Sequence, residues 1–230
     1  MTTAEIRSDN SSWSAFRSTI DLMGPKLNAR ATHCDETREI CCSMTSVLVR
    51  TVRRIKGEAG VRDLLDLSGS VHDAAFLEDT DNWISLEEAN GLLSAGIEVS
   101  GDPTLPRRVG ADAVRQHAGT QVATLLRSLG SPEAVLAGIT TAAAKFSVVT
   151  EMQALEVGAG RAVVRAVARE GFERSTLLCE WTAGLLSTPC MLFGLPAARV
   201  EETECQARGG SECRFTVCWD KELAAAAADP

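Results

Sequence analysis

Two cysteines near the C-terminus have a spacing that suits metal or disulfide chemistry. Between Val200 and Val217, two alternating segments flank Arg208-Gly-Gly-Ser211, a pattern that predicts a β-hairpin with a glycine turn. Cys205 and Cys213 are equidistant from Gly209, so in a simple register they lie opposite each other, with Cβ atoms about 4.5–5.5 Å apart. At that separation two thiolates can share one metal ion, and two thiols can form a disulfide. The choice depends on the compartment and on further ligands.

Composition favours metal ligands or buried thiols for these cysteines. The chain has 230 residues, of which 45% are hydrophobic and 23% charged, as expected for one globular domain with a substantial core. Its net charge of −8, without a dense basic run, argues against direct binding to nucleic acid or to an anionic membrane surface. No secretory signal or membrane-spanning apolar segment is visible, so we expect a cytoplasmic protein. In a reducing compartment, eight cysteines are better explained by metal binding or burial than by a disulfide framework.

Other residues have weaker chemical signals. His117 lies on a predicted helix, where it is either a haem ligand or an ordinary surface or core histidine. Phe146, Met152, Trp181 and Met191 either line an apolar cavity or belong to the core. No Ser-His-Asp set, carboxylate pair or metal-hydroxide site emerges, so we expect a protein that is not an enzyme.

The N-terminal half of the chain reads as helical. Apolar residues repeat at helical spacing over 39–56 and again over 61–67. A capping box, Ser85-Leu-Glu-Glu88, predicts the start of a helix that runs to about Val99. Further helices are predicted over 106–118 and 121–129, and another begins at Ser131-Pro-Glu133.

Between residues 148 and 169, the pattern of apolar residues changes from helical spacing to alternation with polar residues. Residues 148–157 and 161–169 alternate around a glycine turn and predict an antiparallel hairpin, although the arginine spacing leaves a helix open for the second arm. A buried helix over 174–193, bent or ended by Pro189, precedes the cysteine hairpin. The order predicts an α+β fold: an α-rich half, then β-β-α-β-β with an antiparallel sheet. We expect residues 1–37 to be mostly disordered, residues 38–220 to form one sensor domain (a helical half 38–147 and an α+β half 148–220), and residues 221–230 to be a tail or linker.

Residues 151–219 resemble the vinyl-4-reductase-type ligand-binding domain, which is also the N-terminal sensor of phenol-responsive bacterial regulators. The resemblance rests on an early helical Cys179, then Gly194, Glu202-Thr-Glu-Cys205, Gly209 and Cys213. The superfamily also includes haem nitric-oxide-binding domains and vesicle-tethering subunits, and it implies the ligand-binding fold of the nitric-oxide-signalling and Golgi-transport type. The resemblance to the phenol sensors implies a structural zinc ion bound by Cys179, Glu202, Cys205 and Cys213. Glu202 and Cys205 are an odd number of residues apart, so both can bind only if a bulge or loop separates them.

The resemblance implies a cytoplasmic regulatory sensor domain with a structural zinc site. We expect it to bind a small apolar or aromatic molecule, to form a homodimer, and to be the N-terminal module of a bacterial signalling or transcription-control protein. Three alternatives stay open: a ligand-free dimerisation or scaffold domain, a haem-based gas sensor, and a role like that of a tetrapyrrole vinyl reductase. For the cysteines, buried free thiols and a disulfide or redox function remain alternatives to zinc.

Overall fold

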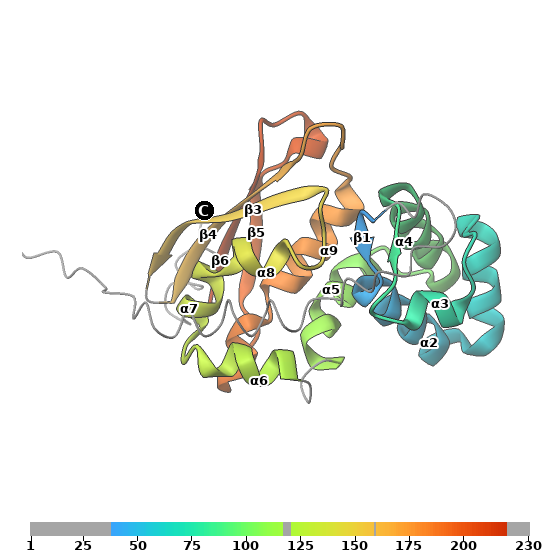
Figure 1. Ribbon diagram of the computed structural model, residues 1–230, viewed down its shortest axis with the longest axis horizontal. Coiled ribbons are helices and arrows are strands. Elements are labelled where there is room, and N and C mark those ends of the chain that lie inside the picture. The colour runs from blue at the N-terminus through green and yellow to red at the C-terminus, as the bar shows by residue number, and fades with distance from the viewer. Residues whose placement is uncertain (1–37, 117–120, 159, 220–230) are drawn as a thin grey trace, which may run out of the picture.

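The computed structural model describes residues 38–116, 121–158 and 160–219, and Figure 1 shows their arrangement. The predicted extension 1–37, the tail 221–230 and His117 lie outside these residues. The helices are α2 (Ser43–Ser68), α3 (Ala74–Glu78), α4 (Leu86–Ser100), α5 (Leu105–Gln116), α6 (Gln121–Ser128), α7 (Pro132–Ala137), α8 (Ile139–Ala143) and α9 (Thr176–Leu186), with 3-10 turns η1 (Pro189–Phe193) and η2 (Gln206–Arg208). The strands are β1 (Ile40–Cys41), β2 (Trp83–Ile84), β3 (Thr150–Gly158), β4 (Arg161–Ala168), β5 (Arg199–Glu204) and β6 (Cys213–Cys218).

A first hydrophobic core lies among α2, α4 and α5. Val47, Leu48, Leu92 and Leu93 are fully buried in it. Helix α2 contains one residue with non-helical angles, Gly57 (φ 71°, ψ −166°), where the sequence pattern predicted a break between two helices. The predicted helical half is therefore observed, with a kink where the glycines interrupt the apolar repeat.

At the start of α4, one of the two hydrogen bonds of the predicted capping box is formed. Ser85 Oγ accepts a hydrogen bond from the Glu88 backbone N–H at 3.1 Å, as predicted. The Glu88 carboxylate does not return to the cap. It instead accepts hydrogen bonds from Ser70 Oγ at 2.5 Å and from His72 Nδ1 at 3.0 Å, which hold the α2–α3 loop against α4.

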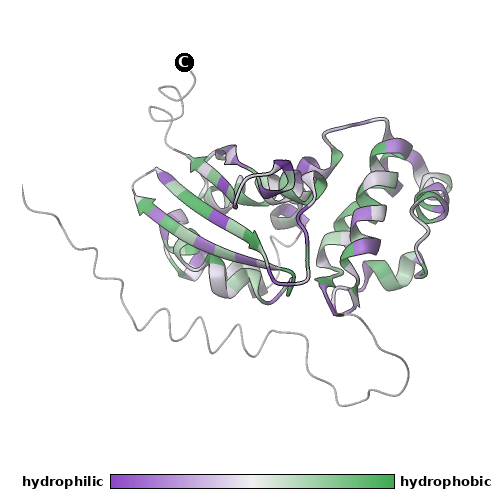
Figure 2. Ribbon diagram, turned by 90° about the horizontal axis from the view of Figure 1, so that it is seen from above, coloured by the Kyte–Doolittle hydropathy of each residue, from purple (hydrophilic) through white to green (hydrophobic). Residues whose placement is uncertain are grey.

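The second half is a four-stranded antiparallel sheet in the order β3-β4-β6-β5. Figure 2 shows hydrophobic and hydrophilic residues alternating along its strands, because successive side chains point to opposite faces. The buried face carries Met152, Val164 and Phe215, which belong to a second hydrophobic core. Residues 161–168 form a strand, so the helix alternative for this segment is wrong; pairing with both β3 and β6 decides it.

Helix α9 joins the two halves. Leu178 packs in the first core, whereas Cys179 and Leu186 pack in the second. The helix ends at Leu186, earlier than the predicted 174–193, because η1 follows with Pro189 at its first turn. In Figure 1, α5 and α9 lie side by side between the sheet and the group of helices α2, α3 and α4.

Small residues let α5 and α9 approach until their backbones touch. A Cβ added to Gly110 would lie 2.1 Å from the Trp181 carbonyl oxygen, and one added to Gly184 would lie 2.0 Å from the Arg107 carbonyl oxygen. Both distances are shorter than any van der Waals contact, so only glycine fits at the two positions. Among the described helices, none is long and apolar enough to cross a membrane.

Candidate metal centre

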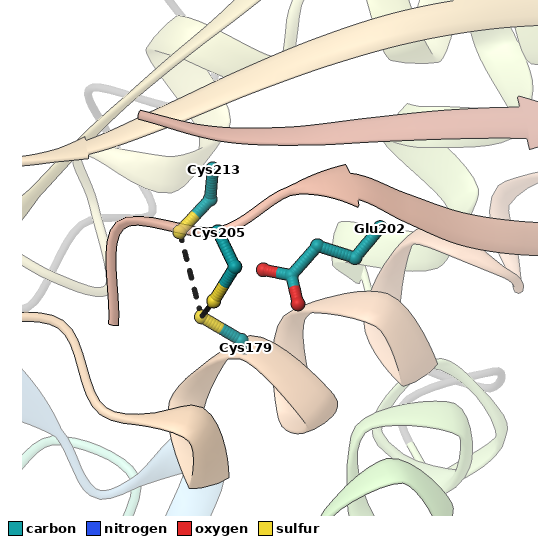
Figure 3. A group of neighbouring side chains, drawn as sticks. All are labelled: Cys179, Glu202, Cys205 and Cys213. Carbon is teal, nitrogen blue, oxygen red and sulfur yellow. Dashed lines mark hydrogen bonds between the residues drawn. The ribbon is translucent and has the colours of Figure 1, made fainter. Parts of the chain in front are cut away.

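Four side chains from three separate segments converge beside the sheet (Figure 3). They are Cys179 on α9, Glu202 on β5, Cys205 directly after β5, and Cys213 at the start of β6. One ligand atom from each lies within 4.8 Å of every other. All three cysteines are buried, and the Glu202 side chain is only 8% exposed. The structure therefore brings together the whole ligand set implied by the sequence resemblance.

The sulfur separations match a metal site. Cys179 Sγ lies 3.5 Å from Cys213 Sγ and 3.8 Å from Cys205 Sγ. In a tetrahedral zinc site with Zn–S bonds of about 2.3 Å, neighbouring sulfurs are about 3.8 Å apart. A disulfide requires about 2.05 Å. The two separations from Cys179 Sγ are thus already close to the spacing that one metal ion would impose, and the third sulfur pair lies within 4.8 Å.

A β-bulge places Glu202 in this cluster. In the β5–β6 ladder, Glu202 pairs with Phe215 and Glu204 pairs with Arg214, so Thr203 is the extra residue. Because the bulge adds one residue to β5, Glu202 and Cys205 can lie on the same face of the sheet despite their odd spacing. Beyond the bulge, Glu204 pairs with Arg214, and the Cys205 and Cys213 sulfurs lie within 4.8 Å of each other, close together as predicted. The prediction of a tight glycine turn is wrong, however, because the 3-10 turn η2 makes the loop between β5 and β6 longer.

One carboxylate oxygen of Glu202 is available for a metal. Oε2 accepts a hydrogen bond from Arg208 Nη2 at 2.5 Å. Oε1 is buried and has no hydrogen-bond partner among the described residues. An unsatisfied buried carboxylate oxygen is costly, and in Figure 3 this carboxylate points toward the cysteines. A metal ion at the centre of the cluster would satisfy it.

The thiols differ in how readily they ionise. A hydrogen bond from the Cys179 thiol lowers the pKa of Cys213, and the backbone N–H of Gln206, 3.3 Å from Cys213 Sγ, acts in the same direction. The same Cys179–Cys213 hydrogen bond, together with burial, raises the pKa of Cys179. Burial raises the pKa of Cys205. Cys213 is therefore the thiol of this pair that ionises more readily, and metal binding would displace the protons of the thiols that bind the ion.

The other buried cysteines lie outside this cluster. Cys190 Sγ donates to the Pro196 carbonyl oxygen at 2.9 Å, and Cys41 Sγ donates to the Thr80 carbonyl oxygen at 3.1 Å. Cys218 is buried at the far end of β6 from Cys213. In the part of the chain that the structure describes, Cys179, Glu202, Cys205 and Cys213 form the one group of potential metal ligands.

The four candidate residues of the ligand cavity are spread over both halves. Trp181 packs against the first core, whereas Met152 and Met191 pack in or against the second. Phe146 is 41% exposed. Neither of two surface pockets, one beside α2 and α4 and one between Leu86 and Ser175, is lined by any of the four. Their role in ligand binding stays a prediction.

Known structures of similar fold come from haem nitric-oxide-binding (H-NOX) proteins. An Fe(II) unliganded H-NOX protein from K. algicida matches with a TM-score of 0.62 and 13% identity, over 80% of this chain and 98% of that one. An S. oneidensis H-NOX protein in the Fe(II)NO state matches with a TM-score of 0.62 and 12% identity, over 79% and 100%. A mutant of the T. tengcongensis H-NOX matches with a TM-score of 0.58 and 15% identity, over 79% and 98%. The chain has the H-NOX fold.

This fold confirms the predicted α+β architecture. It does not support the narrower vinyl-4-reductase-type assignment, which stays a prediction. The sequence matches no known protein family and no curated protein.

Haem is the cofactor that this fold implies, and the candidate haem ligand His117 lies outside the described residues. The one histidine among the described residues, His72, is bound to Glu88 and stacks on Phe76 with ring centroids 3.8 Å apart. At the joint between the halves, α5 and α9 touch along Gly110 and Gly184, which leaves no space between their backbones there. Among the described residues, the cysteine cluster is therefore the group that could hold a metal ion, and His72 is not free to bind haem iron.

Proposed function

We propose that this chain is a regulatory sensor domain of the H-NOX fold that contains a structural zinc ion. Cys179, Glu202, Cys205 and Cys213 would hold the ion, and four protein ligands would leave no open position for catalysis. The observation that carries the proposal is the convergence of three thiols and the unsatisfied Glu202 Oε1 within 4.8 Å. Thiolate ligands favour zinc over calcium or magnesium.

Zinc would tie the β5–β6 hairpin to α9. Because α9 packs in both cores, the ion would stabilise the helix that joins the two halves of the domain. Structural zinc contributes directly to the free energy of folding. We therefore expect its removal to loosen the joint as well as the hairpin.

The experiment is metal analysis of protein purified under reducing conditions. We expect about one zinc per chain, a spectrum typical of tetrahedral thiolate coordination after Co²⁺ substitution, and loss of the metal in Cys205→Ser. Cys190→Ser is the matched control, since Cys190 is equally buried and lies outside the cluster. Metal-free protein with unchanged thermal stability would refute the zinc proposal.

Thiol titration distinguishes zinc-bound cysteines from the two alternatives, which are buried free thiols and a disulfide. Zinc-bound thiols become reactive when a chelator is added. Buried free thiols react only on unfolding, without any metal being released. A disulfide hides two thiols until a reductant is added.

We further propose that the sensor ligand is a small apolar or aromatic molecule and that the domain is a homodimer within a bacterial regulatory protein. The Trp181 indole N–H supports ligand binding, since it is buried and has no acceptor among the residues described. A thermal-shift and calorimetry screen of small aromatics, fatty acids and tetrapyrroles, with Trp181→Ala as control, tests the ligand. Light scattering tests the dimer. If no compound in the screen binds, the alternative of a ligand-free dimerisation or scaffold domain is favoured.

Haem binding through His117 is the second candidate, because the fold is shared with haem-binding proteins. An absorption spectrum decides it. We expect colourless protein, whereas a Soret band that disappears in His117→Ala would establish the haem alternative.

A further inference from the structure

The cysteine cluster would have an excess of negative charge once it holds zinc. Three thiolates, one carboxylate and one Zn²⁺ sum to a net charge of two negative units. Buried charge is costly unless opposite charges lie beside it. Charged groups outside the ligand set should therefore decide how tightly this site holds its metal.

Arg174 contacts the cluster from the start of α9. Its Nη2 donates to Cys179 Sγ at 3.6 Å and to Thr182 Oγ1 at 3.2 Å. Its Nη1 donates to Thr150 Oγ1 at 3.0 Å. The two threonine hydroxyls hold the guanidinium against the sulfur, so its position is set before any metal binds.

The Nε–H donor of Arg174 shows that hydrogen bonding alone does not explain the position of this side chain. Nε is buried and has no partner among the described residues. A half-buried guanidinium with an unsatisfied N–H costs free energy. Attraction between its charge and the thiolates offsets this cost.

Arg208 contacts the opposite side of the cluster. It lies in η2, and its Nη2 donates to Glu202 Oε2 at 2.5 Å, while Oε1 stays buried without a hydrogen-bond partner among the described residues. Its side chain is 55% exposed, so dissolved salt should screen its charge. Arg174 and Arg208 thus contact two different ligands and together supply two positive charges.

We propose that Arg174 and Arg208 are positioning residues that neutralise the zinc-loaded cluster and orient Cys179 and Glu202, with Arg174 contributing more. The inference rests on the proposed zinc site. Arg174 is fixed by two hydroxyls beside a buried sulfur, whereas Arg208 acts from the surface. Their contributions should therefore differ in size and in salt dependence.

The test is zinc affinity, measured by competition with a chromophoric chelator at low and high NaCl. We expect Arg174→Met to weaken zinc binding by about 10–100-fold at both salt concentrations, as for other groups that contact metal ligands. Arg174→Lys should recover part of the loss, since it keeps the charge without the fork of donors. Arg208→Gln should cost less than about tenfold at low salt and almost nothing at high salt.

Arg161→Gln is the matched control, because it removes the same charge from the exposed face of the sheet. Arg161 pairs with Cys218 at the other end of β6 and forms an ion pair with Glu156 at 3.6 Å. Its substitution should leave zinc affinity unchanged. An equal loss in Arg161→Gln would mean that net charge alone is responsible and would overturn the proposal.

Two further readouts separate the possible failures. If Arg174 were merely structural, Arg174→Met would lower the melting temperature of the metal-free and zinc-loaded protein equally; we expect a larger fall in the loaded protein. An unchanged Co²⁺ spectrum in the arginine variants would show that the four metal ligands still bind the ion. If the wild-type protein binds no zinc, the zinc site itself is refuted. If the wild-type protein binds zinc and the arginine variants bind it equally well, only the proposed role of the two arginines is refuted. If Arg174→Met does not fold, Arg174→Lys and the exposed Arg208→Gln still decide the outcome.

Discussion

The contact between α5 and α9 predicts that a single methyl group at Gly184 destabilises the domain. A Cβ at this position would lie 2.0 Å from the Arg107 carbonyl oxygen and 2.9 Å from the Ala111 backbone nitrogen. Ordinary contacts begin at 3.4 Å, so the helices would have to separate by more than 1 Å. The obstructing atoms belong to the backbone, which cannot rotate away as a side chain can.

The expected magnitude follows from two opposing effects. Replacing glycine by alanine within a helix stabilises the helix by about 1 kcal/mol. Overpacking typically costs about 1–3 kcal/mol, and more where the structure cannot yield. Because α9 packs in both cores, separation from α5 would disturb each of them. We expect a net loss of about 2 kcal/mol in the free energy of unfolding, or a fall of about 4–8 °C in melting temperature.

Chemical denaturation and calorimetry of Gly184→Ala measure this effect, with Gly96→Ala as the matched control. A Cβ at Gly96 on α4 would meet only the ends of two leucine side chains, at 2.9 and 3.0 Å, which can shift. We expect Gly96→Ala to stay within about 1 kcal/mol of wild type. A Gly184→Ala protein as stable as Gly96→Ala would refute the close approach of α5 and α9.

Two further predictions concern the helix caps and acid stability. Ser175 Oγ accepts from the Leu178 N–H at 3.2 Å and donates to Asn90 Oδ1 at 2.5 Å, so Ser175→Ala should cost about 1–2 kcal/mol in chemical denaturation, and more than Ser131→Ala, which loses a cap alone. The pKa of Glu212 is lowered by its hydrogen bond from Arg214, and that of Glu204 by its hydrogen bond from the Ser211 hydroxyl. The stability that these two carboxylates contribute should be complete above the unfolded-state pKa of about 4.3 and lost as the pH falls through their lower folded-state values. Melting temperatures between pH 6 and pH 3 should show this loss, reduced in Glu212→Gln, and an unchanged acid limb in that variant would contradict it.

Local chemistry made much of the fold predictable. Ser85, Ser131 and Ser175 all accept a hydrogen bond from an N–H three residues later, and such caps depend only on neighbouring residues. The alternation in β3 and β4 likewise predicted their pairing, because a strand with one buried face must repeat every second residue. The spacing of Cys205 and Cys213 around Gly209 predicted that they would lie close together, although the turn between them is longer than the predicted one.

Tertiary structure decided the remainder of the site. The bulge at Thr203 turns Glu202 toward the cysteines, and nothing in the residues of β5 marks it, because it depends on the pairing of that strand with β6. Arg174 has no motif that links it to Cys179; its place follows from how α9 packs against Thr150 of the sheet. The sequence by itself thus determined the element types, which depend on local spacing, and its resemblance to a known family implied the four candidate metal ligands. Only the packed chain brought these four side chains together and placed Arg174 and Arg208 beside them, because such contacts join residues that are distant in sequence.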